Sequence, residues 1–130
     1  MTNETNQLAL SKEQLDSVIA LYTNRQYQEA IDQIVILDQS YPNVPLLFNL
    51  IGACYKELGQ LELSAKMFET AVDIKPDYEI YLLRGLALYQ LEKYDEAISS
   101  YDESIKLKPD PTAYCNRGLA FVELRKIKEG

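Results

Sequence analysis

The octapeptide FNLIGACY, residues 48–55, recurs 33 residues later as YLLRGLAL, residues 81–88, and once more as YCNRGLAF, residues 114–121. Every copy begins with an aromatic residue and carries a glycine four positions later. A fixed period of this size indicates stacked supersecondary units, each of which buries its apolar face against the next. The sequence therefore predicts an array of repeated units rather than a core assembled from distant segments.

A second pattern follows each of the first two octapeptides: a small residue, an aromatic residue four positions later, another small residue and then a proline. The two copies are Ser64, Phe68, Ala71 and Pro76, and Ala97, Tyr101, Ser104 and Pro109. Spacings of three and four residues place side chains on one helix face, and proline disfavours helix at the residue before it. Each unit is therefore predicted to be a helix–turn–helix that ends at its proline.

This pattern resembles the tetratricopeptide repeat (TPR) over about residues 11–130. The match is nearly complete in the second and third units, whereas the first has Gln14 and Val18 in place of the aromatic residue and the glycine. The resemblance implies an all-α fold, a right-handed superhelical solenoid of antiparallel helix pairs with about three TPR units plus a seventh helix. The expected division is a flexible leader at 1–10 and a single domain at 11–130, with units at about 11–44, 45–77, 78–110 and a half unit at 111–130.

Local signals set the expected helix ends. Ser11 and Gln14 form a capping box, Pro45 and Pro111 suit a first helical turn, and Gly59 suits a left-handed cap. The expected helices are each near 14 residues long and begin near residues 12, 27, 45, 61, 78, 94 and 111, and the last is expected to continue to about Lys128. No segment alternates with period two over a useful length, so no sheet is expected.

The composition argues against several classes of function. The chain of 130 residues has no histidine, which removes the commonest general base and the commonest metal ligand. A net charge of −7 disfavours nucleic acid and anionic membranes, and no apolar run approaches the roughly 20 residues of a membrane span. We expect no catalytic residue, no metal and no cofactor, and we expect Cys54 and Cys115 to be small buried hydrophobes in a reducing compartment.

The repeated glycines have a predicted packing role. Glycine inside a helix costs roughly 1 kcal/mol relative to alanine, so three at one repeat position indicate close helix contact. The small residues Ala30, Ser64 and Ala97 are expected to face that contact. The aromatic residues of the pattern are expected to fill the core: Phe48, Tyr55, Phe68, Tyr81, Tyr101, Tyr114 and Phe121.

If the resemblance holds, the first helices of the units line a concave groove. The predicted partner-binding residues are Leu15, Ile19, Tyr22, Leu46, Asn49, Leu50, Leu82, Leu83, Leu86, Tyr89, Asn116, Leu119 and Val122. Most are apolar, and a large exposed apolar area usually marks a partner site. The alternative interpretation is that superhelical curvature or self-association covers these leucines.

Chaperone-binding TPR proteins hold an EEVD carboxyl terminus with lysine, asparagine and arginine at inward positions. Here those slots hold Leu15, Ile19, Leu50 and Leu83, and shifted registers fail too. Asn116 matches singly, so no such carboxylate clamp is predicted. Arg84 and Arg117 could together bind a carboxylate or phosphate, but bonds to acidic side chains or carbonyls of the neighbouring helix are the favoured interpretation.

The last helix continues the apolar pattern through Phe121, Leu124 and Ile127 as though a partner helix followed. This favours a chain that continues past Gly130. Without such a continuation, we expect the apolar edge to recruit another copy, as a dimer or a swapped helix. A homodimer through the groove is the second possibility.

The predicted function is a protein–protein interaction scaffold that binds an apolar or amphipathic peptide or helix, and not an enzyme. One alternative is an N-terminal recruitment or oligomerisation module of a larger bacterial transferase, because the opening is loosely similar to TPR arrays that precede sulfotransferase or glycosyltransferase domains. The other is a secretion-type TPR chaperone. The protein is expected to be bacterial and to be located in the cytoplasm.

Overall fold

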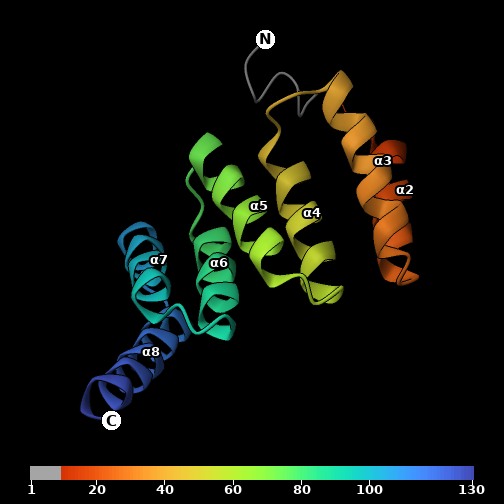
Figure 1. Cartoon of the computed structure of the whole chain (residues 1–130). Helices are drawn as coiled ribbons and strands as arrows, with labels where there is room; N and C mark the ends of the chain where they lie inside the picture. The colour runs from red at the N-terminus through yellow and green to blue at the C-terminus, as the bar shows by residue number, and fades with distance from the viewer. Residues whose placement is uncertain (1–9) are drawn as a thin grey trace.

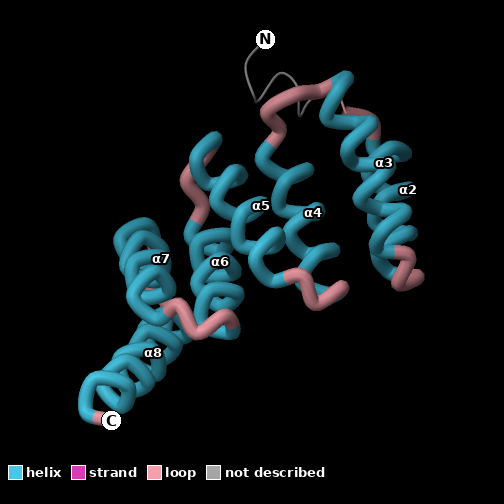
Figure 2. Tube along the Cα trace, viewed as in Figure 1, coloured by secondary structure: helices cyan, strands magenta, loops and turns pink. Residues whose placement is uncertain are grey.

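The computed structural model describes residues 10–130, which form seven helices and no strand. The helices are α2 (Lys12–Thr23), α3 (Tyr27–Ser40), α4 (Pro45–Glu57), α5 (Leu61–Ile74), α6 (Tyr78–Gln90), α7 (Tyr94–Leu107) and α8 (Pro111–Glu129). Figure 1 shows them as successive pairs, with α8 at the carboxyl-terminal end of the stack. Short loops join the helices of each pair (Figure 2), which makes neighbours antiparallel. The predicted all-α solenoid is confirmed.

Most of the predicted helix ends are confirmed. At the start of α2 the Gln14 amide donates to Ser11 Oγ (3.0 Å) and the Ser11 amide donates to Gln14 Oε1 (2.9 Å), which completes the capping box. Gly59 has φ +77°, the left-handed conformation expected after α4. Arg25 and Glu92 adopt φ +63° at the corresponding turns. The turn within each of the three pairs therefore contains one residue in the left-handed conformation. Only the turn between α4 and α5 has glycine there, which adopts this conformation without strain.

The last helix continues to near Lys128, as predicted, and is longer than the helices before it. α8 spans 19 residues, and nothing after Phe121 supplies a turn residue. Arg125 instead pairs with Glu129 (2.8 Å) and Lys126 with Glu123 (3.2 Å), at spacings of four and three residues. Such pairs stabilise a helix, which explains why α8 continues past the position where the earlier units turn.

The core is divided into three clusters along the stack. The first lies among α2, α3 and α4 and includes Val18, Ile34 and Leu47. Leu10, the last residue of the expected leader, is buried in this cluster, and residues 1–9 lie outside the described part of the chain. The third cluster joins α5 to α6 around Phe68, and the second joins α5, α6, α7 and α8 around Tyr101. No single centre therefore holds the molecule together, as is typical of repeat arrays.

The repeated glycines make close contact in two of the three units. A Cβ on Gly52 would lie 2.6 Å from Cε1 of Phe68, and a Cβ on Gly85 would lie 2.7 Å from Cδ1 of Tyr101. The ring four residues after the small residue therefore covers the Cβ position of each of these two glycines, and Ser64 faces Gly52 as expected. The predicted close approach is wrong for Gly118, which has nothing within 4 Å of its Cβ position. None of the described helices lies against that side of α8.

Buried serines pin the two helices of a pair to each other. Ser64 Oγ donates to the Gly52 carbonyl, Ser100 Oγ to the Tyr81 carbonyl, and Ser104 Oγ to the Tyr78 carbonyl, each at 2.7 Å. All three serines are fully buried. A buried hydrogen bond contributes about 1 kcal/mol, and leaving such a group unpaired costs more. These contacts fix α5 in register on α4 and α7 in register on α6.

The Tyr101 hydroxyl is buried without a hydrogen-bond partner among the described residues. Phe68 occupies the corresponding position one unit earlier and has no hydroxyl to satisfy. We expect Tyr101→Phe to raise the free energy of unfolding by about 1 kcal/mol, because it removes an unpaired polar group. Urea denaturation followed by far-ultraviolet circular dichroism measures this difference, with Phe68→Tyr as the matched reverse change, which should destabilise.

The same hydroxyl gives the prediction a pH dependence. Burial, with a smaller effect of Tyr89, raises the pKa of Tyr101 to about 12 from its ordinary value near 10. The folded state therefore holds the proton more tightly than the unfolded state. Ionisation of this hydroxyl does not affect the free energy of unfolding below about pH 10. As pH rises from about 10 towards 12, the unfolded state loses the proton first, so the free energy of unfolding falls. The Tyr101→Phe protein should lose less stability over that range, and an equal loss would contradict this assignment.

Three residues expected in the core are exposed. Cys115 lies on the surface, and Tyr114 and Phe121 are 46% and 51% exposed. All three lie on α8, where the described chain provides no second helix to cover them. Cys54 is buried as expected. Burial, together with the nearby Glu57 carboxylate, raises the pKa of its thiol to about 11, so the group stays protonated near neutral pH.

Candidate functional site

The predicted groove residues lie on α2, α4, α6 and α8, the first helices of the successive pairs. None of them is fully buried. Ile19, Leu119 and Val122 are between 47% and 49% exposed, and the others are half-buried. Water therefore reaches apolar side chains on all four helices, which is the property that the predicted site requires.

A cavity of about 280 Å³ lies between α4 and α6. Three of the predicted residues, Leu46, Asn49 and Leu83, line it together with Ile80. Its remaining lining includes Lys75, Asp77 and Glu79, from the segment that leads from α5 into α6. The structure therefore brings part of the predicted site together as an apolar hollow with a charged edge.

The charged edge is partly occupied by local contacts. Asp77 Oδ1 accepts hydrogen bonds from the Glu79 and Ile80 amides at 2.9 and 3.2 Å, which caps α6. The Tyr78 hydroxyl donates to Glu79 Oε1 (2.9 Å). These bonds hold two carboxylates beside the cavity, so a partner with exposed carboxylates would meet repulsion there.

Several predicted groove residues also pack within the chain. Tyr22 meets Tyr27 edge to face with ring centroids 5.4 Å apart, and Tyr89 meets Tyr94 in the same way at 5.3 Å. Burial, and then the Glu57 carboxylate of α4, raise the pKa of Tyr22. Other members rest partly on the core clusters: Leu15, Leu46, Leu50, Leu82 and Leu83.

The two repeated arginines form the predicted ion pairs with neighbouring helices. Arg117 Nη1 lies 2.7 Å from Asp102 Oδ1, and Arg84 Nη2 lies 3.8 Å from Glu69 Oε2. The acidic partners are themselves 33 residues apart, so one contact is repeated in two successive units. The Arg84 pair is looser, and its buried Nε has no hydrogen-bond partner among the described residues.

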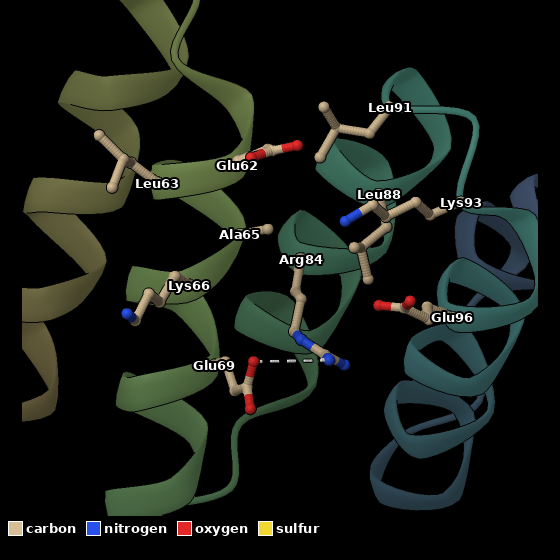
Figure 3. Close-up of a pocket in the computed structure, with 10 residues that line it drawn as sticks. All are labelled: Glu62, Leu63, Ala65, Lys66, Glu69, Arg84, Leu88, Leu91, Lys93 and Glu96. Atoms are coloured by element: carbon tan, nitrogen blue, oxygen red, sulfur yellow. Dashed lines mark ion pairs between the residues drawn. The ribbon is translucent and has the colours of Figure 1, made fainter.

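A larger cavity of about 480 Å³ surrounds Arg84 among α5, α6 and α7. Figure 3 shows Arg84 reaching between the helices, with Glu69 on one side and Glu96 on the other. Its apolar lining includes Leu63, Leu88 and Leu91. The sequence analysis missed this cavity because it assigned binding only to the first helix of each unit. The signal was present in the mixed charges of α5 at Glu62, Lys66 and Glu69.

Residues 10–130 contain no group of three or more histidine, cysteine, aspartate or glutamate side chains placed to hold a metal ion. They also contain no helix that is both long and apolar enough to cross a membrane.

Comparison with known proteins identifies the class that this fold defines. A family described as "TPR repeat" matches residues 85–124, and one described as "Tetratricopeptide repeat" matches residues 47–78. The two matches together cover more than half of the chain. The chain belongs to the tetratricopeptide repeat family. Its fold is that of solved TPR domains.

Among individual proteins, the chain is similar to the Sgt2 TPR domain from Aspergillus fumigatus, with TM-score 0.81 and 21% identity over 94% of this chain and 85% of that one. It is also similar to the first TPR of Spaghetti (RPAP3), bound to the HSP90 peptide SRMEEVD, with TM-score 0.78 and 22% identity over 85% and 89%. Anaphase-promoting complex subunit 3 of Dictyostelium discoideum is 33% identical over 76 residues, which are 58% of this chain but 8% of that protein. The chain therefore spans a small part of this relative's length.

Proposed function

We propose that the chain binds an apolar or amphipathic segment of a partner protein along the exposed faces of α2, α4, α6 and α8. The observation that supports this proposal is the cavity of about 280 Å³ between α4 and α6, lined by Leu46, Asn49 and Leu83. Half-exposed apolar side chains on α2 and α8 add to the apolar surface of the proposed site. An amphipathic helix or an extended segment buries such a stripe most fully, and Asn49 offers it an amide for hydrogen bonding.

The partner segment in this proposal is not an acidic carboxyl terminus. The positions that would clamp such a peptide hold Leu15, Leu50 and Leu83, and Glu79 lies beside the cavity. Removing a carboxylate from water next to leucines and another carboxylate is unfavourable. The peptide SRMEEVD, which is bound in the RPAP3 structure, is therefore a suitable negative probe.

The test uses two peptides and one pair of matched variants. A helical peptide composed of leucine and lysine is the positive probe, and SRMEEVD is the negative one, both fluorescently labelled and followed by anisotropy. Leu86→Glu places a charge on the proposed face, and Leu63→Glu places the same charge on α5, where Leu63 is 43% exposed. Circular dichroism checks that both variants stay helical.

We expect the leucine–lysine peptide to bind, Leu86→Glu to weaken it at least ten-fold, and Leu63→Glu to leave it unchanged. SRMEEVD should not compete with it. Equal binding to the two variants, or competition by SRMEEVD, would remove the support for this site.

Narrower roles remain predictions. A recruitment or oligomerisation module of a bacterial sulfotransferase or glycosyltransferase, and a secretion-type chaperone, would each use the same apolar face. The cytoplasmic location and the homodimer also remain predictions. Each of these roles requires that the apolar face be accessible, which the peptide-binding test measures.

A further inference from the structure

We propose that the cavity around Arg84 is a second docking site, which binds a helix of a partner protein through one carboxylate and two neighbouring aliphatic side chains. Arg84, Leu88 and Leu91 line this cavity of about 480 Å³ from α6, and α5 and α7 lie on either side of it (Figure 3). We call this surface the Arg84 trough. It shares no lining residue with the cavity between α4 and α6, so it does not depend on the function proposed above.

The Arg84 guanidinium is partly buried without a hydrogen-bond acceptor. Its side chain is 21% exposed, its Nη2 lies 3.8 Å from Glu69 Oε2, beyond hydrogen-bond distance, and its buried Nε has no partner among residues 10–130. Arg117, at the same position one unit later, lies 2.7 Å from Asp102. Unpaired buried donors cost free energy. A carboxylate that enters the trough can accept two parallel hydrogen bonds from the guanidinium, which is the contact that Arg84 lacks.

Leucines lie beside this guanidinium at a spacing that a helix can match. Leu88 and Leu91 follow Arg84 by four and seven residues, so the three share one face of α6, and Figure 3 shows them in this order along the helix. At 1.5 Å per residue, Arg84 and Leu88 are about 6 Å apart along the helix axis. A partner helix with two aliphatic residues three positions apart, and a carboxylate four positions further on, presents complementary groups in the same order.

The trough is open and long, which favours a segment of a protein over a small molecule. A further hollow of about 420 Å³ shares Glu62, Leu63 and Leu91 with it and continues to Gly59. Leu63 is 43% exposed, at the edge of both hollows. Small-molecule sites enclose most of their ligand, whereas a helix lying on this surface keeps its outer face in water.

The charges of the trough limit the partner to a single carboxylate. Cations and carboxylates are equal in number among its charged lining residues, which are Lys66, Arg84, Lys93, Glu62, Glu69 and Glu96. All three glutamates are exposed, whereas Arg84 is partly buried, so water screens the repulsion more than it screens the attraction to Arg84. A phosphate dianion or an acidic cluster would meet the repulsion of all three glutamates. The net charge of −7 favours basic residues elsewhere on the partner helix.

The probe is an alanine-based helical peptide with two leucines three residues apart, a glutamate four residues after the second leucine, and lysines on the opposite face. The whole chain is titrated with it and followed by NMR. We expect saturable shifts at Arg84, Leu88 and Leu91. The same peptide with glutamine in place of glutamate should bind about ten-fold more weakly, because the charge-assisted hydrogen bonds are lost.

Arg84→Met removes the guanidinium and keeps an unbranched side chain. We expect it to weaken the glutamate peptide about ten-fold and to leave the glutamine peptide unchanged. The thermal midpoint of the chain should not fall, because an unpaired buried donor is removed. Arg117→Met is the matched control, since Arg117 is already paired with Asp102, and it should leave the affinity of both peptides unchanged.

Leu63→Glu and Leu86→Glu separate the Arg84 trough from the groove. Leu63 lines the trough, whereas Leu86 is a predicted groove residue. Measured from the NMR shifts at Leu88, Leu63→Glu should weaken the glutamate peptide about ten-fold or more, and Leu86→Glu should leave it unchanged. This is the reverse of the pattern expected for the leucine–lysine peptide, so either proposal can fail while the other stands.

Four results would overturn the proposal. The first is the absence of saturable shifts at Leu88 with peptide up to about 1 mM, the weak end of measurable affinity. The second is equal affinity of the glutamate and glutamine peptides, and the third is equal weakening of both by Arg84→Met. The fourth is binding that Leu86→Glu abolishes and Leu63→Glu does not, because the peptide would then occupy the groove.

Discussion

Replacing Phe68 with alanine is expected to lower the free energy of unfolding by about 3–5 kcal/mol, the range measured for large core aromatic residues. Phe68 is fully buried, covers Gly52 within its own unit, and leads a core cluster that includes Ile80 of the next unit. Its removal therefore opens a cavity both within a unit and between units. Because a small domain has about 5–15 kcal/mol in total, this change alone brings the chain close to unfolding.

The matched control is the same substitution on an exposed ring. Phe121→Ala, where the side chain is 51% exposed, is expected to cost less than about 1 kcal/mol. Urea denaturation followed by circular dichroism measures both proteins, since the chain has no tryptophan to report on unfolding. Similar losses at Phe68 and Phe121 would mean that the Phe121 ring is covered in solution.

Gly85→Ala and Gly118→Ala are expected to have effects of opposite sign. Alanine at position 85 places a Cβ 2.7 Å from Cδ1 of Tyr101, and that ring is fully buried and cannot move aside freely. Overpacking of this kind costs about 1–3 kcal/mol. At position 118 the Cβ meets nothing within 4 Å, so the helix preference for alanine gives a gain of about 0.5–1 kcal/mol.

The difference between the two glycine variants tests the packing interpretation of the repeat. Thermal and urea denaturation of both proteins give the two signs directly. If Gly85→Ala stabilised the chain as Gly118→Ala does, the repeated glycine would have no packing role. The Tyr101 ring would then not restrict the side chain at position 85.

The helices and their order were predictable because several independent local signals agreed. The capping box at Ser11, the proline at position 45 and the left-handed Gly59 each fixed one helix end without reference to the rest of the chain. The 33-residue spacing then fixed the order of the pairs. A bond from Arg117 to an acidic side chain or carbonyl of the neighbouring helix was predictable for the same reason, and the structure identifies Asp102 as the partner.

Burial was predictable only where a neighbour exists to provide it. Tyr114, Cys115 and Phe121 occupy positions of the repeat pattern on α8. The pattern identifies these positions, but it does not show whether another helix packs against them. Conversely, the cavity around Arg84 depends on three helices and on the 3.8 Å separation from Glu69. No spacing in the sequence indicates that this pair is looser than the equivalent pair at Arg117.

The buried serine contacts also decide where the stack can bend. Ser64, Ser100 and Ser104 attach second helices to first helices within a pair, whereas the seam between α5 and α6 has apolar contacts and the 3.8 Å pair of Arg84 and Glu69. Apolar surfaces slide at low cost because their attraction has no preferred direction, but a hydrogen bond weakens steeply when its angle changes. We therefore expect the pairs α4/α5 and α6/α7 to be stiffer than the seam between α5 and α6, and we expect bending at that seam to change the distance between α4 and α6.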